Sequence, residues 1–180
     1  MKRADHETDD GTIKSLGGPV LYSTLVKKGE QSLMSTEENK ALVRRWLKEC
    51  YNKGNVAVAD ELIATNYVNH STPHGQMSGL KGEKQYITMI RSAFPDFHLA
   101  IEDQIAEGDK VVTRLTASGT YGGGLEDIPS TAAIGKQVRV TEILIHRISA
   151  GKVVEGWIEF DQLGLWQQLG VIPSMGEGRE

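Results

Sequence analysis

The stretch GKVVEGWIEFDQLGL, residues 151–165, decides the fold, because it predicts a strand that runs directly into a helix. Successive side chains of a strand alternate between two faces. The faces here are Glu155, Trp157, Glu159 and Asp161 on one side, and Val154, Ile158 and Phe160 on the other. Carboxylates beside a large aromatic side chain on a partly buried face favour an acid/base site, because desolvation raises a carboxyl pKa toward neutrality. The alternative is a surface strand with solvated Glu side chains and an anchoring Trp.

Three more segments with period-two alternation precede this strand, at residues 97–107, 110–121 and 136–149. Tight hairpin turns are expected at Glu107-Gly108-Asp109 and at Ala150-Gly151. We therefore predict a long antiparallel meander, with a loop at residues 122–135 and a closing helix at residues 162–168.

Helical periodicity marks the first half of the domain. Ser35 and Glu38 have the spacing of a capping box, and the apolar helix face that follows continues to Tyr51, before Gly54 ends the helix. Two further helices are expected at residues 55–64 and 80–93, separated by a short extended piece at 67–70 and a loop at 71–79. Helices followed by antiparallel strands predict an α+β domain, in which the helices pack on one face of a curved sheet.

The predicted sheet has two largely apolar faces. In the segment 136–149, one face carries Val138, Val140, Glu142, Leu144, His146 and Ile148, and the other carries Arg139, Thr141, Ile143, Ile145 and Arg147. The helices can cover only one face, so the other needs a partner, most simply a second copy of the chain. We expect a homodimer through the face that carries Ile143, Ile145, Ile158 and Phe160.

Composition and charge exclude several classes of protein. The 180 residues carry a net charge of −4 with acids and bases mixed throughout, so we expect no nucleic-acid partner. No apolar run approaches the roughly 20 residues of a membrane helix, and the first residues do not lead into the apolar segment of a signal peptide. The single cysteine, Cys50, suits a reducing compartment, so we expect a cytoplasmic protein in which Cys50 is a core residue.

The chain divides into three parts by composition. Residues 1–33 have balanced charge, few apolar side chains and no clear period, so we expect a poorly ordered N-terminal extension. Residues 34–173 form the predicted domain, and residues 174–180 a C-terminal tail.

Several residues and motifs could have either a chemical or a structural role. A lone His among apolar residues, such as His146, is usually a hydrogen-bonded core residue, although His is also the commonest acid/base group. His70 and His74 have a spacing that could bind zinc on a helix, but Pro73 and Gly75 exclude a helix, so no metal site is expected. The chain contains neither a phosphate-binding loop nor the Gly-x-Ser-x-Gly turn of α/β-hydrolases.

Six segments, in order across residues 34–173, resemble the SnoaL-like polyketide cyclases, also called ester cyclases, of the nuclear-transport-factor-like superfamily. These segments are ENKALVRR (38–45), YVNH (67–70), AFPDF (93–97), EGDKVVTR (107–114), GKVVE (151–155) and DQLGLWQQLG (161–170). The chain departs from the family pattern by Tyr121 after Gly119-Thr120, and by a longer loop at residues 128–135 that would lie at the pocket mouth.

The resemblance implies a cone-shaped, cystatin-like α+β barrel, with N-terminal helices on the concave face of the sheet and a hydrophobic pocket between them. It implies dimers or tetramers through the outer sheet face, and no metal or cofactor. It also implies an intramolecular aldol ring closure on an aromatic polyketide ester, in which Asp161 is the acid/base and His146 lies near it. We expect substrate contacts from six side chains: Trp46, Tyr67, His70, Phe94, Tyr121 and Trp157.

Two interpretations of function remain open. In the first, the protein is a cofactor-independent cyclase or isomerase whose Asp161 moves a proton on a ketone or ester. In the second, it is a non-catalytic dimer whose pocket holds a small apolar ligand or whose sheet recruits a partner. The environment of Asp161 separates them: a catalytic Asp faces a cavity, whereas a structural one would pair with Arg114 or Arg147.

Overall fold

A computed structural model describes residues 34–71, 79–125, 128 and 131–173, and the compact unit begins at Met34. The predicted N-terminal extension, the tail at residues 174–180 and His74 lie outside the described residues. The helices are α2 (Thr36–Trp46), η1 (Leu47–Asn52), η2 (Val56–Val58), α3 (Ala59–Leu62), α4 (Gly79–Ala93), η3 (Thr131–Ala133) and α5 (Gln162–Leu169). The strands are β1 (Ile63–Asn69), β2 (His98–Glu107), β3 (Lys110–Thr120), β4 (Gln137–Ser149) and β5 (Lys152–Phe160).

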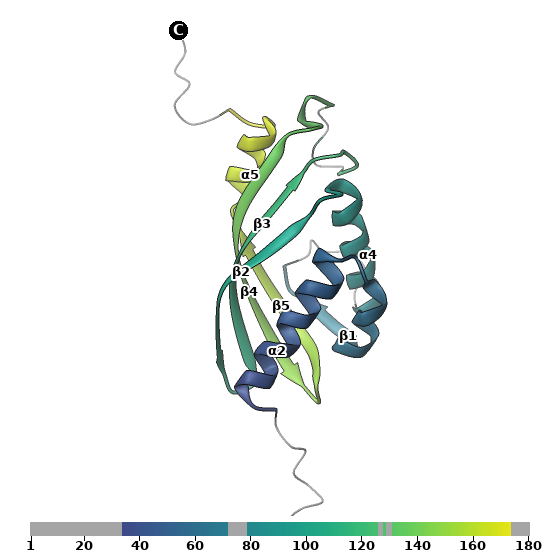
Figure 1. The fold of residues 1–180 in the computed structure, drawn as a ribbon, viewed down its shortest axis with the longest axis vertical. Helices are drawn as coiled ribbons and strands as arrows, with labels where there is room; N and C mark the ends of the chain where they lie inside the picture. The colour runs from purple at the N-terminus through teal and green to yellow at the C-terminus, as the bar shows by residue number, and fades with distance from the viewer. Residues whose placement is uncertain (1–33, 72–78, 126–127, 129–130, 174–180) are drawn as a thin grey trace, which may run out of the picture. The chain divides into compact units, whose positions relative to one another are not determined.

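The five strands form one sheet in the order β1-β5-β4-β3-β2, with helices α2 and α4 on one side of it (Figure 1). The predicted meander is confirmed, because β2, β3, β4 and β5 pair antiparallel in sequence order. The turns between Glu107 and Lys110 and between Ser149 and Lys152 are two residues long, as expected. Both residues of the second turn, Ala150 and Gly151, have positive φ, which a two-residue hairpin of type I′ requires.

Strand β1 differs from the sequence-based expectation. The helix predicted at residues 55–64 ends at Leu62, and Ile63 begins a strand that pairs parallel with β5. Ile63 is fully buried opposite Val153, so tertiary packing of a β-branched side chain outweighs the local helical periodicity. The chain thereby gains a parallel edge strand beside the meander.

The first helix begins as predicted and ends differently. The Ser35 hydroxyl accepts a hydrogen bond from the Glu38 backbone, and the Glu38 carboxylate accepts one from the Ser35 backbone at 2.7 Å, which completes the capping box. After Trp46 the α-helix continues as the π-helix η1, where one continuous helix was expected. The Asn52 side chain then bonds both backbone groups of Leu99, so the end of η1 is tied to β2.

Helices α2, η1 and α4 cover the inner face of the sheet and enclose the main core (Figure 1). Its fully buried side chains include Val43, Leu47, Ile87, Val111, Leu115 and Val153. Cys50 belongs to this core, as expected, and its burial raises the thiol pKa to about 11. A second cluster, centred on Phe94, Tyr121 and Leu169, closes the end of the sheet near α5.

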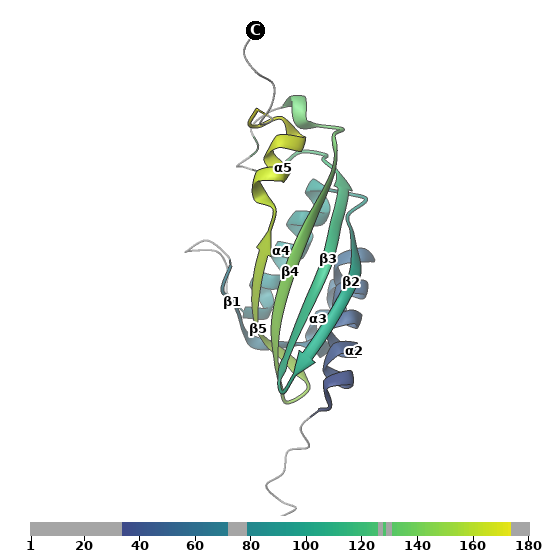
Figure 2. The same cartoon turned by 90° about the vertical axis from the view of Figure 1, so that its left-hand side faces the viewer.

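The outer face of the sheet, seen in front of the helices in Figure 2, differs in part from the predicted dimer face. Side chains that face each other across antiparallel strands share a face. Ile145 pairs with Trp157, whereas Leu144 pairs with Ile158. The assignment of Ile158 and Phe160 to the same face as Ile143 and Ile145 is therefore wrong.

The outer face instead carries an apolar row across four strands. Consecutive pairs in the register join Ile105 to Val112, Val112 to Ile145, and Ile145 to Trp157. Ile105 exposes 64% of its surface and the neighbouring Ile143 exposes 49%. Exposed apolar residues gathered in this way favour a protein–protein contact.

The homodimer remains a prediction, and the apolar row specifies which residues of the outer face would form the contact. Replacing Ile145 by Glu would bury a charge at the centre of a symmetric contact, which costs several kcal/mol. We expect the wild-type chain to sediment at twice its 19.7 kDa mass and the I145E variant to dissociate at least about 100-fold more readily. Equilibrium sedimentation at micromolar concentration measures this, and a monomeric wild type would contradict it.

Gly156 offers a test of the packing between β1, β4 and β5. A Cβ added at Gly156 would collide with the Tyr67 hydroxyl and would lie 3.2 Å from the His146 ring. We expect Gly156→Ala to lower the free energy of unfolding by about 1–3 kcal/mol, as overpacking of a tight core does. In a Tyr67→Phe background the same change should cost clearly less, because the clashing oxygen is gone. Denaturant melts of the four proteins measure both values, and equal costs would contradict the explanation.

Candidate functional site

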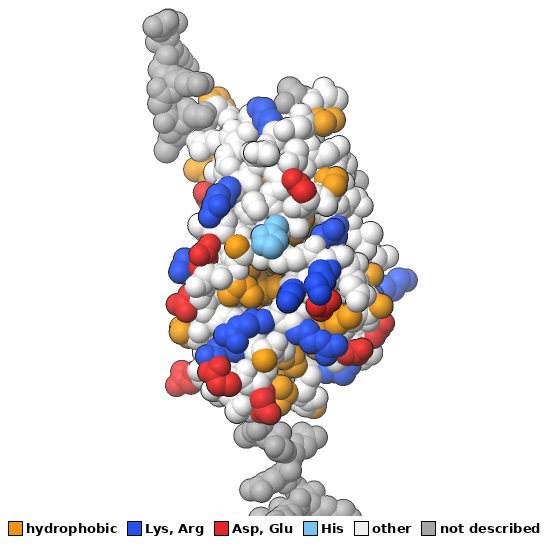
Figure 3. All heavy atoms as spheres, in the orientation of Figure 1, with side chains coloured by type: hydrophobic (Ala, Val, Ile, Leu, Met, Phe, Trp, Pro, Cys, Tyr) orange, Lys and Arg blue, Asp and Glu red, His pale blue; other side chains and the backbone are white. Residues whose placement is uncertain are grey.

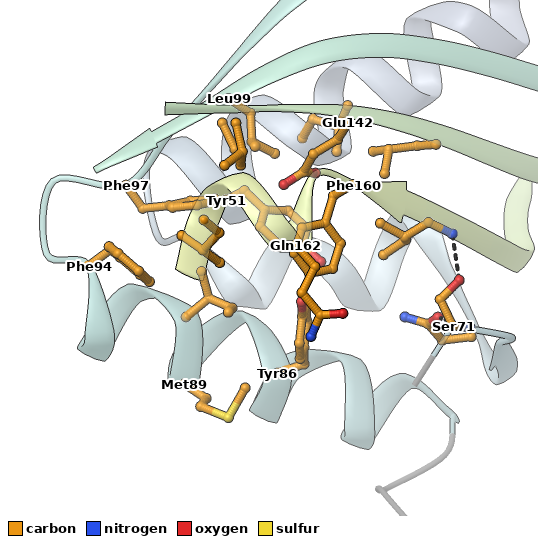
Figure 4. A pocket seen from close by; sticks show the side chains of 18 of the residues that line it. Tyr51, Ser71, Tyr86, Met89, Phe94, Phe97, Leu99, Glu142, Phe160 and Gln162 are labelled. Atoms are coloured by element: carbon orange, nitrogen blue, oxygen red, sulfur yellow. Dashed lines mark hydrogen bonds between the residues drawn. The ribbon is translucent and has the colours of Figure 1, made fainter. Parts of the chain in front are cut away.

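A cavity of about 730 Å³ lies between the inner face of the sheet and helices η1, α4 and α5 (Figure 4). This volume falls in the usual range of small-molecule sites. Most of its wall is aromatic or aliphatic, including Trp46, Tyr51, Tyr67, Tyr86, Phe94, Phe97, Phe160 and Trp166. Its described lining residues include two glutamates and a histidine but neither Lys nor Arg. The cavity therefore suits a mainly apolar ligand without negative charge.

Glu142 projects into this cavity from the middle of β4 (Figure 4). The alternation of β4 places it on the inner face between Val140 and Leu144, and the register sets it opposite Phe160. Its carboxyl group makes no hydrogen bond or ion pair with any residue that the structure describes. Burial alone raises the pKa of Glu142 to about 7, so the group can both lose and gain a proton near neutral pH.

Glu83 lines the cavity from helix α4 and is 3% exposed. The Tyr51 hydroxyl donates a hydrogen bond to its carboxyl group at 2.6 Å. Burial raises the pKa of Glu83 to about 7, although hydrogen bonds from the Tyr51 and Asn69 side chains act in the opposite direction. The cavity thus contains two acids whose pKa values lie near neutrality.

His146 lies deeper in the cavity, on the same face of β4 as Glu142. It sits opposite Gly156, and its ring packs edge-on against Trp46 with centroids 4.7 Å apart. Burial lowers the pKa of His146 to about 3, so the ring is neutral at physiological pH. Its Nδ1 atom has no hydrogen-bond partner in the described part of the chain, which differs from the hydrogen-bonded core histidine that is usual.

Asp161 follows the last residue of β5 and forms the N-cap of helix α5. Its side chain accepts a hydrogen bond from the Gly164 backbone at 2.8 Å. The residue is exposed and is not among the described side chains that line the cavity. Neither Arg114 nor Arg147 pairs with it in the described structure. The role of Asp161 as acid/base therefore stays a prediction from the resemblance.

The other carboxylates of the 151–165 stretch lie on the outer face of the sheet. Glu155 forms a two-pronged ion pair with Arg147, at 2.7 and 3.2 Å, which lowers its pKa. Trp157 stacks on His70, with ring centroids 4.5 Å apart and an interplanar angle of 8°. For Glu155 and Trp157, the alternative of a surface strand with an anchoring Trp is the one that the structure shows.

The predicted substrate-contacting side chains fall into three groups. Trp46, Tyr67 and Phe94 line the cavity, and the structure brings them together with His146. His70 and Trp157 lie outside it, stacked on each other. Tyr121 is buried beside the cavity rather than in its wall. Its hydroxyl bonds the Ile128 carbonyl and the Leu125 amide, so it anchors a loop whose Leu125 and Ile128 do reach the cavity.

Sequence reasoning did not select Glu83 and Glu142, yet each carries a signal. Glu142 is the one acid in the inner-face alternation from Val138 to Ile148. Glu83 precedes Ile87 by four residues, which puts it on the apolar stripe of α4. The pattern that marks this site is a single carboxylate at a position where the strand or helix period is otherwise apolar. A group of carboxylates beside a Trp does not mark it.

The described residues show no sign of two other kinds of site. They contain no group of three or more His, Cys, Asp or Glu side chains that could hold a metal ion. None of their helices has the length and apolarity needed to cross a membrane. On the face shown in Figure 3, basic and acidic side chains are interspersed around small apolar areas.

Comparisons with known proteins give one consistent result. Residues 41–169 match the family of SnoaL-like polyketide cyclases. Among solved structures, TsrD from Streptomyces laurentii is 29% identical, with a TM-score of 0.70 over 77% of this chain and 99% of that one. A candidate polyketide cyclase from Bacillus cereus is 28% identical, with a TM-score of 0.64 over 77% and 87% of the two chains. IdmH from Streptomyces antibioticus, also a candidate polyketide cyclase, is 26% identical, with a TM-score of 0.62 over 73% and 98%. No curated protein shows significant sequence similarity to the chain.

The raised pKa of Glu142 predicts how stability depends on pH. A carboxyl group with a pKa of 4.5 in the unfolded chain and about 7 in the fold stabilises the protein fully below pH 4.5. That stability is lost as pH rises from 4.5 through 7, by at most about 3.5 kcal/mol at roughly 1.4 kcal/mol per pKa unit. We expect Glu142→Gln to remove part of this loss, and Glu159→Gln on the exposed outer face to change nothing. Urea melts between pH 5 and 8.5 measure it, and parallel curves for wild type and E142Q would contradict the assignment.

Proposed function

Because the chain belongs to the SnoaL-like polyketide cyclase family, we propose that its cavity binds a neutral aromatic ketone or ester and that Glu142 moves a proton on it. The observation that carries this proposal is a carboxyl group that has a pKa of about 7, lies inside an aromatic cavity, and makes no hydrogen bond or ion pair with the residues that the structure describes. General acid/base catalysis is most effective when the pKa of the catalytic group lies near the working pH.

The shape and chemistry of the cavity support this class of ligand. Tyr86, Phe94, Phe97 and Phe160 present flat apolar surfaces that suit fused aromatic rings (Figure 4). The described wall lacks Lys and Arg, and its two acids repel negative charge, so a free carboxylate or phosphate would bind poorly. A carboxyl function of the ligand would therefore enter as an ester.

The proposed reaction begins with the Glu142 carboxylate. It takes a proton from the carbon next to the ligand carbonyl, and the electron pair of the broken C–H bond moves into an enolate. The enolate carbon attacks a second carbonyl of the same molecule and forms the new carbon–carbon bond. Glu142 then returns its proton to the resulting alkoxide oxygen. Holding both ends of one molecule in a single cavity supplies the proximity that this ring closure needs.

Four predicted site residues have defined places in this proposal. His146 is neutral and buried and contributes to the cavity wall. Trp46 and Tyr67 shape the wall beside it. Asp161 keeps its position at the start of α5, next to the cavity-lining Gln162, where it orients the helix that closes the cavity.

Proton exchange on a model ketone tests the proposal. We expect the protein to speed exchange of the α-protons of 2-tetralone in D₂O, followed by NMR, with a rate that rises about tenfold per pH unit from pH 5 to 6.5 as Glu142 ionises. Glu142→Gln should lower that rate by about 10²–10⁴-fold, because the amide cannot carry the proton. Asp161→Asn should keep most of the rate.

The control results separate the alternatives. Loss of exchange in the Asp161→Asn variant, with E142Q unaffected, would return the acid/base role to Asp161. Wild-type exchange no faster than buffer, together with measured binding of 2-tetralone, would favour the non-catalytic binding module.

A further inference from the structure

Glu83 is a buried acid that the proposed mechanism leaves unused. It is 3% exposed, it lines the cavity, and the described lining offers no cation to balance its charge. The group that donates to it is the neutral Tyr51 hydroxyl, at 2.6 Å, and the Asn69 amide assists. Burying an ionised carboxylate without a cation is costly, so the group retains its proton into the neutral range.

Glu83 and Glu142 belong to opposite walls of the cavity. Glu142 projects from β4, whereas Glu83 lies on α4, one turn before Tyr86 (Figure 4). Tyr86 projects into the cavity between these walls. Burial raises the pKa of its phenol, and the charges of Glu142 and Glu83 raise it further, so both carboxyl groups lie within electrostatic reach of the same ring. A ligand in this cavity therefore meets one acid on the sheet wall and one on the helix wall.

The carboxyl groups of Glu83 and Glu142 can be in different protonation states in the same molecule. Both pKa values lie near 7, so a large share of the molecules at neutral pH has one carboxyl group ionised and the other protonated. Enolisation needs both states at once, because a base must act on carbon while an acid acts on oxygen.

We propose that Glu83 is the general acid of the site, which donates its proton to the carbonyl oxygen of the ligand while Glu142 removes the proton from the neighbouring carbon. This inference rests on the proposed function, because it assigns the second half of the same proton transfer. In the forward step the C–H bond breaks toward Glu142, the π electrons shift to oxygen, and the O–H bond of Glu83 breaks as the enol O–H forms. The reverse step restores both carboxyl groups.

The groups that face Glu83 do not obscure its titration. The groups that interact with it are Cys50 and Tyr51 on η1, Tyr67 and Asn69 on β1, and Tyr86 on α4. Glu142 and His146 on β4 line the same cavity. Burial raises the pKa of Cys50 to about 11 and of each tyrosine above its usual range, and it keeps His146 neutral above about pH 3. Between pH 5 and 9 only the two glutamates of this group change charge.

The pH profile of 2-tetralone exchange tests the inference. We expect a bell for the wild type, which rises as Glu142 ionises and falls above about pH 7 as Glu83 loses its proton. Glu83→Gln should abolish the falling limb and lower the maximum by about 10-fold, because the amide still donates a hydrogen bond but no proton. A wild type with no falling limb up to pH 9, or an E83Q variant that keeps it, would overturn the proposal.

The Tyr51→Phe variant separates a catalytic Glu83 from a merely structural one. Only a catalytic Glu83 would make the pH profile of exchange depend on the Tyr51 hydroxyl. The Tyr51 hydroxyl lowers the pKa of Glu83, so its removal should shift the falling limb to higher pH by about 0.5–1 unit. The rising limb should stay in place. An unshifted falling limb, in a variant that melts cooperatively, would contradict the assignment.

A binding measurement covers the case in which no exchange is seen. The carbonyl signal of 2-tetralone labelled with ¹³C at the ketone should move downfield when bound to the wild type at pH 6, since a donor polarises the bond. Glu83→Leu should abolish that movement and Glu83→Gln should retain part of it. An unchanged signal in a folded E83L variant would overturn the inference, whereas a shifted signal without exchange would contradict only the proposed role of Glu142.

Discussion

Strand β4 can present only one of its faces to the helices, and this constraint determines where each polar group of the cavity lies. It is the longest strand and is paired on both sides, so its register cannot slip without moving Leu144 and Ile148 out of the core. The same alternation carries Glu142 and His146 inward. Their burial, and therefore their shifted pKa values, follows from the pairing of β4 with its neighbours.

Much of the fold could be predicted from period and turn chemistry. The meander, its two-residue turns, helix α4 and the capping box of α2 follow from local signals that tertiary packing reinforces. The change from α-helix to π-helix after Trp46 has no comparable local signal. The pairing of β1 with β5 was also missed, because a parallel contact brings together segments about 90 residues apart. The first two residues of β1, Ile63 and Ala64, fit the end of the predicted helix, whereas residues 67–70 are predicted as extended.

The candidate site was harder to predict because the sequence of β5 does not show which of its two faces is buried. Both of its faces carry large apolar side chains, so alternation defines two sets of residues without telling which set lies inward. The register with β4 resolves this, since Ile158 pairs with the buried Leu144 while Trp157 pairs with Ile145. Trp46, Tyr67, Phe94 and His146 were assigned to the cavity from the family resemblance, and the structure places them there. Glu83 and Glu142 needed the burial of their neighbours to become visible.

Two acids in one apolar cavity, whose described wall offers them no cation, also couple ligand binding to protons. A neutral ligand that fills the space displaces water from both carboxyl groups and so disfavours their ionised forms. By thermodynamic linkage, a group whose pKa rises on binding takes up protons from solution as the ligand enters. Occupancy of the cavity is then a function of acidity: a more alkaline solution favours the empty state, and a slightly acidic one favours the filled state. The same two carboxyl groups that define the chemistry of the cavity thereby set the conditions under which it is occupied.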